Sequence, residues 1–257
     1  MSRLTVQAFL RGPDAYRIAG NWHPLAALLA TAGVIAAGQC VPILAFAVFG
    51  SPAPHVTPDA SQTNAAFPLS DAATAWLLVA SQAALALLTI EVAALHRARP
   101  QDNLHLDRPE GGWRAIVFAL LLMLPLSLAI NALSYAISPQ GYIADYQQFK
   151  AMAQSSTFWG SFIGIAVGAP IWEEFLFRGF LLGPLSAAFG FWPAALLVSG
   201  AWTLLHFGYS LAGLLEVFLV GLYFAWLLRR TGSLWVPIAC HAGYNAAMFM
   251  TLRYGVA

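Results

Sequence analysis

Charged residues are scarce in this chain, and cysteine is almost absent. Of its 257 residues, 9% are charged and 60% are hydrophobic, whereas a soluble domain usually carries about a quarter charged residues. This composition, with a mean hydropathy of +0.69, favours a membrane protein, and a net charge of +1 gives no basis for nucleic-acid binding. Cys40 and Cys240 are too few for a disulfide framework or a cysteine-ligated zinc site.

Long apolar runs predict the fold. A helix needs about 20 apolar residues to cross the hydrocarbon core, and seven runs approach that length: 24–49, 73–95, 113–137, 157–182, 192–208, 211–228 and 233–252. A chain in lipid must satisfy its own backbone groups, and these runs do not alternate with a period of two, so we expect helices rather than a barrel. The predicted fold is all-α, a polytopic transmembrane bundle of about seven to eight membrane helices.

The chain divides into three predicted parts. Residues 1–22 carry arginines among apolar residues and are expected to form a cytoplasmic or interfacial segment. Residues 23–156 are N-terminal transmembrane helices and loops, in which 138–156 is expected to lie as a short amphipathic helix on the outer surface. Residues 157–257 are the C-terminal transmembrane helices, which carry the polar motifs.

The cations predict an orientation, because Lys and Arg collect in cytoplasmic loops. A cytoplasmic N-terminus places ten of the twelve cations inside and leaves Lys150 and Arg253 outside. We therefore expect a multi-pass protein integral to the plasma (inner) membrane, with a cytoplasmic N-terminus and an active site toward the cytoplasm.

The run IWEEFLFRGF is an exception to the scarcity of charge. Glu173, Glu174 and Arg178 fall within one and a half helical turns of a membrane segment, where a charge costs about 3 kcal/mol or more and marks a candidate functional site. Residues four apart nearly align, so Glu174 and Arg178 can pair while Glu173 points elsewhere and is left for chemistry. A buried ion-pair network that serves only the fold is the alternative interpretation.

Three further polar residues lie in other apolar runs. His206 ends AWTLLH, and His241 and Asn245 are four apart and project from one helix face. A glutamate and a histidine can polarise a water, while a second histidine and an amide can hold an oxyanion, which suits amide hydrolysis. Glutamate and histidine could instead hold a divalent metal such as zinc, with Glu173, His206 and His241 as ligands. Both mechanisms stay open, and a divalent metal is the one candidate cofactor.

EEFLFR resembles the Glu-Glu-x-x-x-Arg motif of the CPBP family of intramembrane proteases, the CAAX-protease and bacteriocin-processing (Abi-like) family. His206 and the His241-x-x-x-Asn245 pair match the family's later motifs in the same order. The resemblance implies that Glu173 activates water together with His206. It also implies that His241 and Asn245 stabilise the oxyanion. In the same motif, Glu174 is implied to pair with Arg178.

One position departs from the family pattern. Trp202 stands where the family usually has phenylalanine, four residues before the histidine. We expect the exchange of one aromatic residue for another to preserve packing, with some change to the cavity wall.

The same residues disfavour some other classes of membrane protein and leave others open. The chain has no His-Glu-x-x-His motif, and its aspartates fall outside the apolar runs, which disfavours zinc site-2 and aspartyl membrane proteases. A non-enzymatic scaffold or immunity protein that retains the fold stays open, as does an ion or proton transporter that uses Glu173, Glu174, Glu216 and the histidines as a relay. The expected partners are the lipid bilayer and a membrane-associated peptide or protein substrate, with CAAX-type peptides among the candidates.

Overall fold

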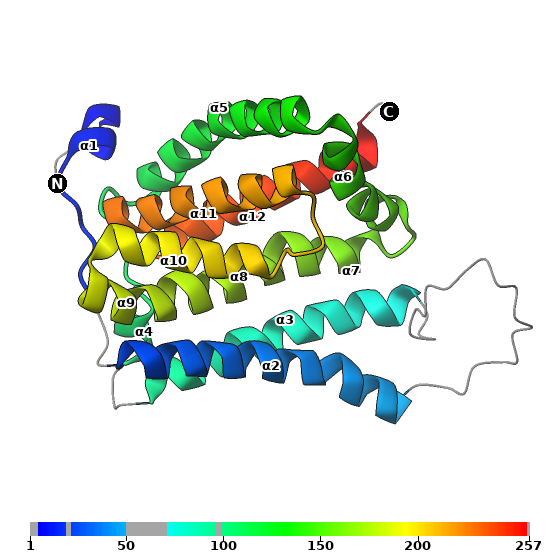
Figure 1. The fold of residues 1–257 in the computed structure, drawn as a ribbon, viewed down its shortest axis with the longest axis horizontal. Coiled ribbons are helices and arrows are strands. Elements are labelled where there is room, and N and C mark those ends of the chain that lie inside the picture. Colours follow the sequence, from blue (N-terminus) through cyan, green and yellow to red (C-terminus); the bar gives the residue numbers. More distant parts are fainter. Residues whose placement is uncertain (1–4, 19–21, 50–70, 96–98, 256–257) are drawn as a thin grey trace, which may run out of the picture.

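The computed structural model describes residues 5–18, 22–49, 71–95 and 99–255, which form helices and connecting turns without a strand (Figure 1). The all-α prediction is confirmed for these ranges. The helices are α1 (Val6–Arg11), α2 (Pro24–Phe49), α3 (Asp71–Ala94), α4 (Pro100–Asn103), α5 (Trp113–Ile137), α6 (Pro139–Gln154), α7 (Phe158–Phe162), η1 (Ile163–Gly168), α8 (Ala169–Glu174), η2 (Phe175–Leu181), α9 (Leu182–Phe189), α10 (Phe191–Leu204), α11 (Leu211–Thr231) and α12 (Trp235–Tyr254).

A helix occurs at each of the seven predicted runs. Four described helices are long and apolar enough to cross a membrane: Ala72–Ala94, Trp113–Ile137, Phe158–Phe189 and Leu211–Thr231. The fourth run continues past its predicted end at 182, because α7 to α9 form one uninterrupted rod to Phe189. The fifth run is shorter than predicted, since α10 ends at Leu204 and a turn follows.

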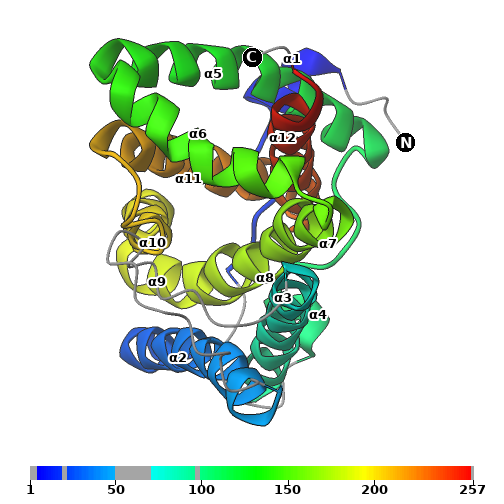
Figure 2. The ribbon, with the colours of Figure 1, turned by 90° about the vertical axis from the view of Figure 1, so that its right-hand side faces the viewer.

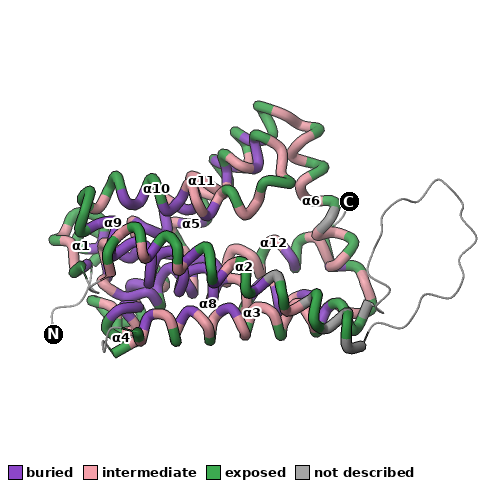
Figure 3. The backbone as a smooth tube through the Cα atoms, turned by 60° about the horizontal axis from the view of Figure 1, so that its bottom comes forward, coloured by how far each residue is buried: buried purple, intermediate pink, exposed green. Residues whose placement is uncertain are grey.

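The α7–α9 rod lies in the middle of the molecule. Viewed end-on, α2 and α3 pack on one side of the rod, and α11, α12 and α5 lie on the other (Figure 2). Glycines at 160, 164 and 168 face α3 so closely that a Cβ added to Gly164 would lie 2.7 Å from Leu78. Small residues allow this approach between membrane helices. Buried residues gather around the rod, and every residue of η2 is buried (Figure 3).

The bundle has two chemically different ends, which we call the arginine end and the α6 end. The arginine end holds α1, α4, the end of α9 and the C-terminal end of α11, and its cations are Arg11, Arg17, Arg99, Arg108, Arg114, Arg229 and Arg230 (Figure 1). At the α6 end the described cations are Lys150 and Arg253. The two ends correspond to the two predicted membrane faces.

Exposed aromatic rings occur at both ends, as expected for a protein that crosses a bilayer. They are Trp113, Trp192 and Trp235 at the arginine end, and Tyr135, Trp159 and Tyr254 at the α6 end. The helix α5 has 25 residues, and such a helix extends about 37 Å, enough to cross a hydrocarbon core of about 30 Å.

The segment before α2 is held against the arginine end. The Asp14 carboxylate accepts from Arg229 Nε at 2.7 Å and from Arg230 Nη1 at 2.9 Å. Arg230 Nε also donates to the Phe9 carbonyl at 3.0 Å. Residues 139–154 form α6, so a helix lies within the segment 138–156 where one was predicted.

His105, in the turn after α4, is expected to make the fold sensitive to acid. Its side chain packs on Tyr16, and burial lowers the pKa of the imidazole to about 4, against the opposing effect of the Asp107 charge. An unfolded histidine titrates near 6.5, so the unfolded chain binds the proton first as the pH falls. The stabilisation is complete above pH 6.5 and is lost between about 6.5 and 4, by about 3 kcal/mol in total.

Thermal unfolding in detergent at pH 7 and pH 4.5 measures this loss. The matched variant is His105→Asn, because asparagine tolerates the left-handed backbone (φ 52°) found at this position. We expect the variant to lose less stability on acidification than the natural chain. Equal losses in the two proteins would contradict the assignment.

Candidate active site

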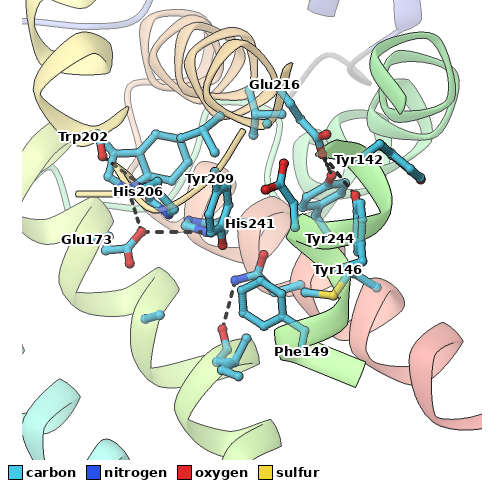
Figure 4. Close-up of a pocket in the computed structure, with 18 residues that line it drawn as sticks. Tyr142, Tyr146, Phe149, Glu173, Trp202, His206, Tyr209, Glu216, His241 and Tyr244 are labelled. Carbon is cyan, nitrogen blue, oxygen red and sulfur yellow. Dashed lines mark hydrogen bonds and ion pairs between the residues drawn. The ribbon is translucent and has the colours of Figure 1, made fainter. Parts of the chain in front are cut away.

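The polar motif residues line one cavity of about 190 Å³ inside the bundle (Figure 4). Glu173 comes from α8, His206 from the turn after α10, and His241 and Asn245 from α12. The remaining wall is apolar and aromatic, with Asp145 and Glu216 as further carboxylates. The structure therefore brings together four polar groups that lie far apart in the sequence.

Glu173 is buried and held in place by a tryptophan. The indole Nε1 of Trp202 donates a 2.6 Å hydrogen bond to Oε2 of Glu173. His241 Nε2 lies 4.0 Å from the same oxygen. A phenylalanine could pack in place of Trp202 but could not donate this bond, so the departure from the family pattern adds a contact to the carboxylate. The sequence suggested only packing at this position.

Glu174 and Arg178 form the pair expected from their spacing. Arg178 Nη1 donates to Glu174 Oε1 at 2.9 Å, and both side chains are fully buried. Arg178 Nη2 donates to the Gly221 carbonyl at 3.2 Å, and its guanidinium lies 4.4 Å from the Trp202 ring. The charge is therefore paired, hydrogen-bonded and covered by an aromatic face, as a buried cation requires.

Glu174 has a second contact that the sequence did not reveal. Its Oε1 lies 3.1 Å from His241 Nδ1. Because an ionised carboxylate can only accept, Nδ1 carries the proton, and the other ring nitrogen, Nε2, is the one nearer Glu173. The ring also stacks on Phe224, with centroids 4.8 Å apart. Glu174 thus orients His241, in addition to pairing with Arg178.

His206 is oriented by the backbone of its own helix end. Its Nδ1 lies 3.1 Å from the Trp202 carbonyl oxygen, which can only accept, so Nδ1 donates and Nε2 is left as an acceptor. The imidazole lies with its centroid 5.3 Å from the Trp202 ring and 5.3 Å from the Tyr209 ring. His206 therefore presents a basic nitrogen beside the tryptophan that holds Glu173.

Asn245 fills a gap in the hydrogen bonding of the rod. In η1 the N–H groups bond five residues back, as Ala169 N does to Gly164 O. Pro170 has no N–H, so in this register the Ile165 carbonyl lacks its helical partner. Asn245 Nδ2 donates to that carbonyl at 2.9 Å. π-helical segments often occur at functional sites, and here η1 and η2 flank the helical turn that carries the two glutamates.

Glu216, whose role the sequence left open, lies in the wall of the same cavity. Its Oε1 accepts from Tyr146 Oη at 3.3 Å and from Tyr244 Oη. These bonds connect α11 to α6 and α12. No sequence motif includes Tyr244, and the segment 138–156, which contains Tyr146, predicts only an amphipathic helix on the outer surface.

The alternative mechanism would need a divalent metal ion. Among the residues that the structure describes, no three His, Cys, Asp or Glu side chains are grouped so that they could hold a metal ion. Glu173, His206 and His241 share the cavity, and the contacts above engage Oε2 of the first and Nδ1 of both histidines, which leaves Oε1 and the two Nε2 atoms. These three atoms are the ones that would hold zinc in the alternative mechanism, because metal-bound histidines commonly donate the other ring N–H to a carboxylate or a backbone carbonyl.

Comparison with known proteins gives the family of the motif-bearing segment. Residues 155–247 match the family model described as type II CAAX prenyl endopeptidase Rce1-like. The chain is 29% identical over 175 residues to the uncharacterized protein YyaK of Bacillus subtilis (strain 168), a match that covers 62% of this chain and 55% of that protein. This chain thus spans little more than half the length of that relative. No solved structure matches this chain significantly. Residues 155–247, which contain every motif residue from Glu173 to Asn245, are therefore similar to the Rce1-like type of CAAX endopeptidase, in line with the resemblance of these motifs to the CPBP family of membrane proteases.

Proposed function

We propose that this protein is an intramembrane endopeptidase that hydrolyses a peptide bond of a membrane-associated substrate. The observation that carries the proposal is the convergence of Glu173, His206 and His241 in one largely apolar cavity. A base, an acceptor nitrogen and a candidate oxyanion donor lie there within the bundle, where polar interactions are stronger than in water.

In the proposed reaction, Glu173 is the general base. Its Oε2 is occupied by Trp202, which fixes the carboxylate and leaves Oε1 to accept a proton from water. The acceptor nitrogen Nε2 of His206 holds the other hydrogen of the same water, so the nucleophile is oriented toward the carbonyl carbon. After attack, Glu173 returns the proton to the leaving amine.

The oxyanion formed by this attack needs hydrogen-bond donors. His241 can donate from Nε2 as an imidazolium, and the Glu174 carboxylate at Nδ1 stabilises that charged form. Asn245 uses one amide hydrogen for Ile165 and has a second available. We assign these two residues to the oxyanion, in agreement with the roles that the family resemblance implies.

A comparison of new protein N-termini tests the proposal. Membranes from cells expressing the natural chain or Glu173→Gln at matched abundance are compared, because glutamine keeps the size of the side chain and removes the base. We expect N-termini that appear only with the intact glutamate, and their sequences identify the substrate. If both proteins are folded and the sets are identical, the protease proposal fails in favour of a non-enzymatic scaffold that retains the fold.

A further inference from the structure

The cavity extends along the bundle in one direction from the catalytic residues. Four helical segments carry the motif residues or face them. On each segment, the residues that line the cavity lie beside the motif residues or nearer the α6 end, and none lies nearer the arginine end. They fall within 165–173 of the rod, 202–206 of α10 and its turn, 213–220 of α11 and 241–248 of α12. The rest of the lining is Tyr209 and four residues of α6: Tyr142, Asp145, Tyr146 and Phe149.

Toward the arginine end the cavity is closed by packed side chains. Arg178 is fully buried against Glu174 and the Trp202 ring. Phe224, which stacks on His241, and Phe177 are also fully buried. A peptide could not reach Glu173 from the arginine end without unpacking this layer.

The open side of the cavity is framed by α6 and the turn between α10 and α11. Asp145 accepts from the Ser210 backbone N–H at 2.8 Å and from its hydroxyl at 2.6 Å, which fixes the turn to α6. Beside this frame, Phe207 is 85% exposed, and Leu204 and Leu211 are also exposed. Large apolar side chains at the end of a membrane bundle are stable when they insert into the lipid interface. The opening is therefore placed at a membrane surface.

The distribution of cations identifies which surface this is. The arginines of the described chain gather at the arginine end, apart from the buried Arg178 and from Arg253, which lies with Lys150 at the α6 end. Cations collect on the cytoplasmic side of membrane proteins. The sequence predicted both a cytoplasmic N-terminus and a cavity open to the cytoplasm. These two predictions are incompatible, because the N-terminal segment lies at the arginine end and the cavity extends away from that end. The positions of Lys and Arg in the sequence predict which helix ends are cytoplasmic, but they do not predict the direction in which a cavity between the helices opens.

We propose that the active-site cavity opens to the non-cytoplasmic face of the membrane and takes its substrate from there. The substrate is then an extended peptide segment that is anchored in or on the non-cytoplasmic leaflet. Its chain passes between α6 and the 205–210 turn to reach Glu173. That this peptide is a substrate rests on the proposed protease function. The orientation of the cavity does not depend on that function.

Cysteine labelling in intact bacterial spheroplasts tests the orientation. In a Cys40→Ala background, which leaves only the buried Cys240, one variant carries Ala144→Cys on α6 and the other carries Gln101→Cys on α4. Both native side chains are exposed. We expect a membrane-impermeant maleimide to label the first variant before lysis and the second only after it. Labelling in the reverse order would overturn the proposal.

The side of the membrane on which substrates are cleaved gives a second readout. This readout can fail independently of the cysteine labelling. Glu173-dependent N-termini are expected within segments that the host's proteins expose on the non-cytoplasmic side, and sites confined to cytoplasmic segments would overturn the proposal. If Ala144→Cys is labelled from outside and no Glu173-dependent cleavage occurs, the protease function fails while the outward-facing cavity stands. The Cys40→Ala protein, which retains only the buried Cys240, gives the background labelling for both variants.

Discussion

Replacing Glu173 by glutamine is expected to lower the rate of peptide cleavage by about 10³-fold, because loss of a positioned general base typically costs 10²- to 10⁴-fold. The glutamine carbonyl oxygen can still accept the Trp202 hydrogen bond, so the tertiary contacts of the site survive. The rate is measured with purified protein in liposomes on a substrate identified from its new N-terminus. A variant that keeps more than a tenth of the natural rate would exclude Glu173 as the base.

Trp202→Phe is the matched control for that experiment. It keeps the carboxylate and an aromatic ring, and it removes the 2.6 Å bond that positions Oε2. A hydrogen bond to a charged group contributes about 1.5 to 3 kcal/mol, so we expect a loss of about 10- to 100-fold, smaller than that of Glu173→Gln. If the two losses were equal, placement of the carboxylate rather than its basicity would account for the effect. Unfolding temperatures of both variants show whether the fold is retained.

The sequence predicted the helices better than it predicted their internal geometry. Apolar runs report burial in lipid, and a helix is present at each of them. Hydropathy contains no information on whether an N–H bonds four or five residues back, so η1 and η2 were not foreseen. The early end of α10 was also missed, because Phe207 in the turn is as apolar as the helix before it.

In the site, contacts within one helix were predictable and contacts between helices were not. The Glu174–Arg178 pair follows from a four-residue spacing on a single helix. The bonds of His241 to Glu174 and of Trp202 to Glu173 join different helices, and only the packing of the bundle brings these atoms together. Asn245 was assigned from its motif, but its bond to Ile165 depends on the missing N–H of Pro170.

The buried Glu174–Arg178 ion pair is expected to matter for stability as well. Arg178→Met is expected to destabilise the protein by about 3 to 5 kcal/mol, because removing one partner leaves the other charge buried and uncompensated. Glu174 is fully buried, and its Oε2 has no hydrogen-bond partner among the described residues. Unfolding of the purified protein in detergent, followed by temperature or denaturant, measures the loss. A variant as stable as the natural chain would show that the pair contributes little to the fold.

The double variant Glu174→Gln, Arg178→Met separates stability from catalysis. Removing both charges leaves no unpaired ion in the bundle, so most of the stability lost in Arg178→Met is expected to return. The glutamine oxygen can still accept from His241 Nδ1, which keeps the ring in place, but it no longer stabilises a charged imidazolium. Cleavage should therefore remain strongly reduced in a protein that is again stable. If stability and cleavage were both recovered, Glu174 would serve the fold alone. If stability returned without cleavage, the charge of Glu174 would be identified as the group that supports His241 during catalysis.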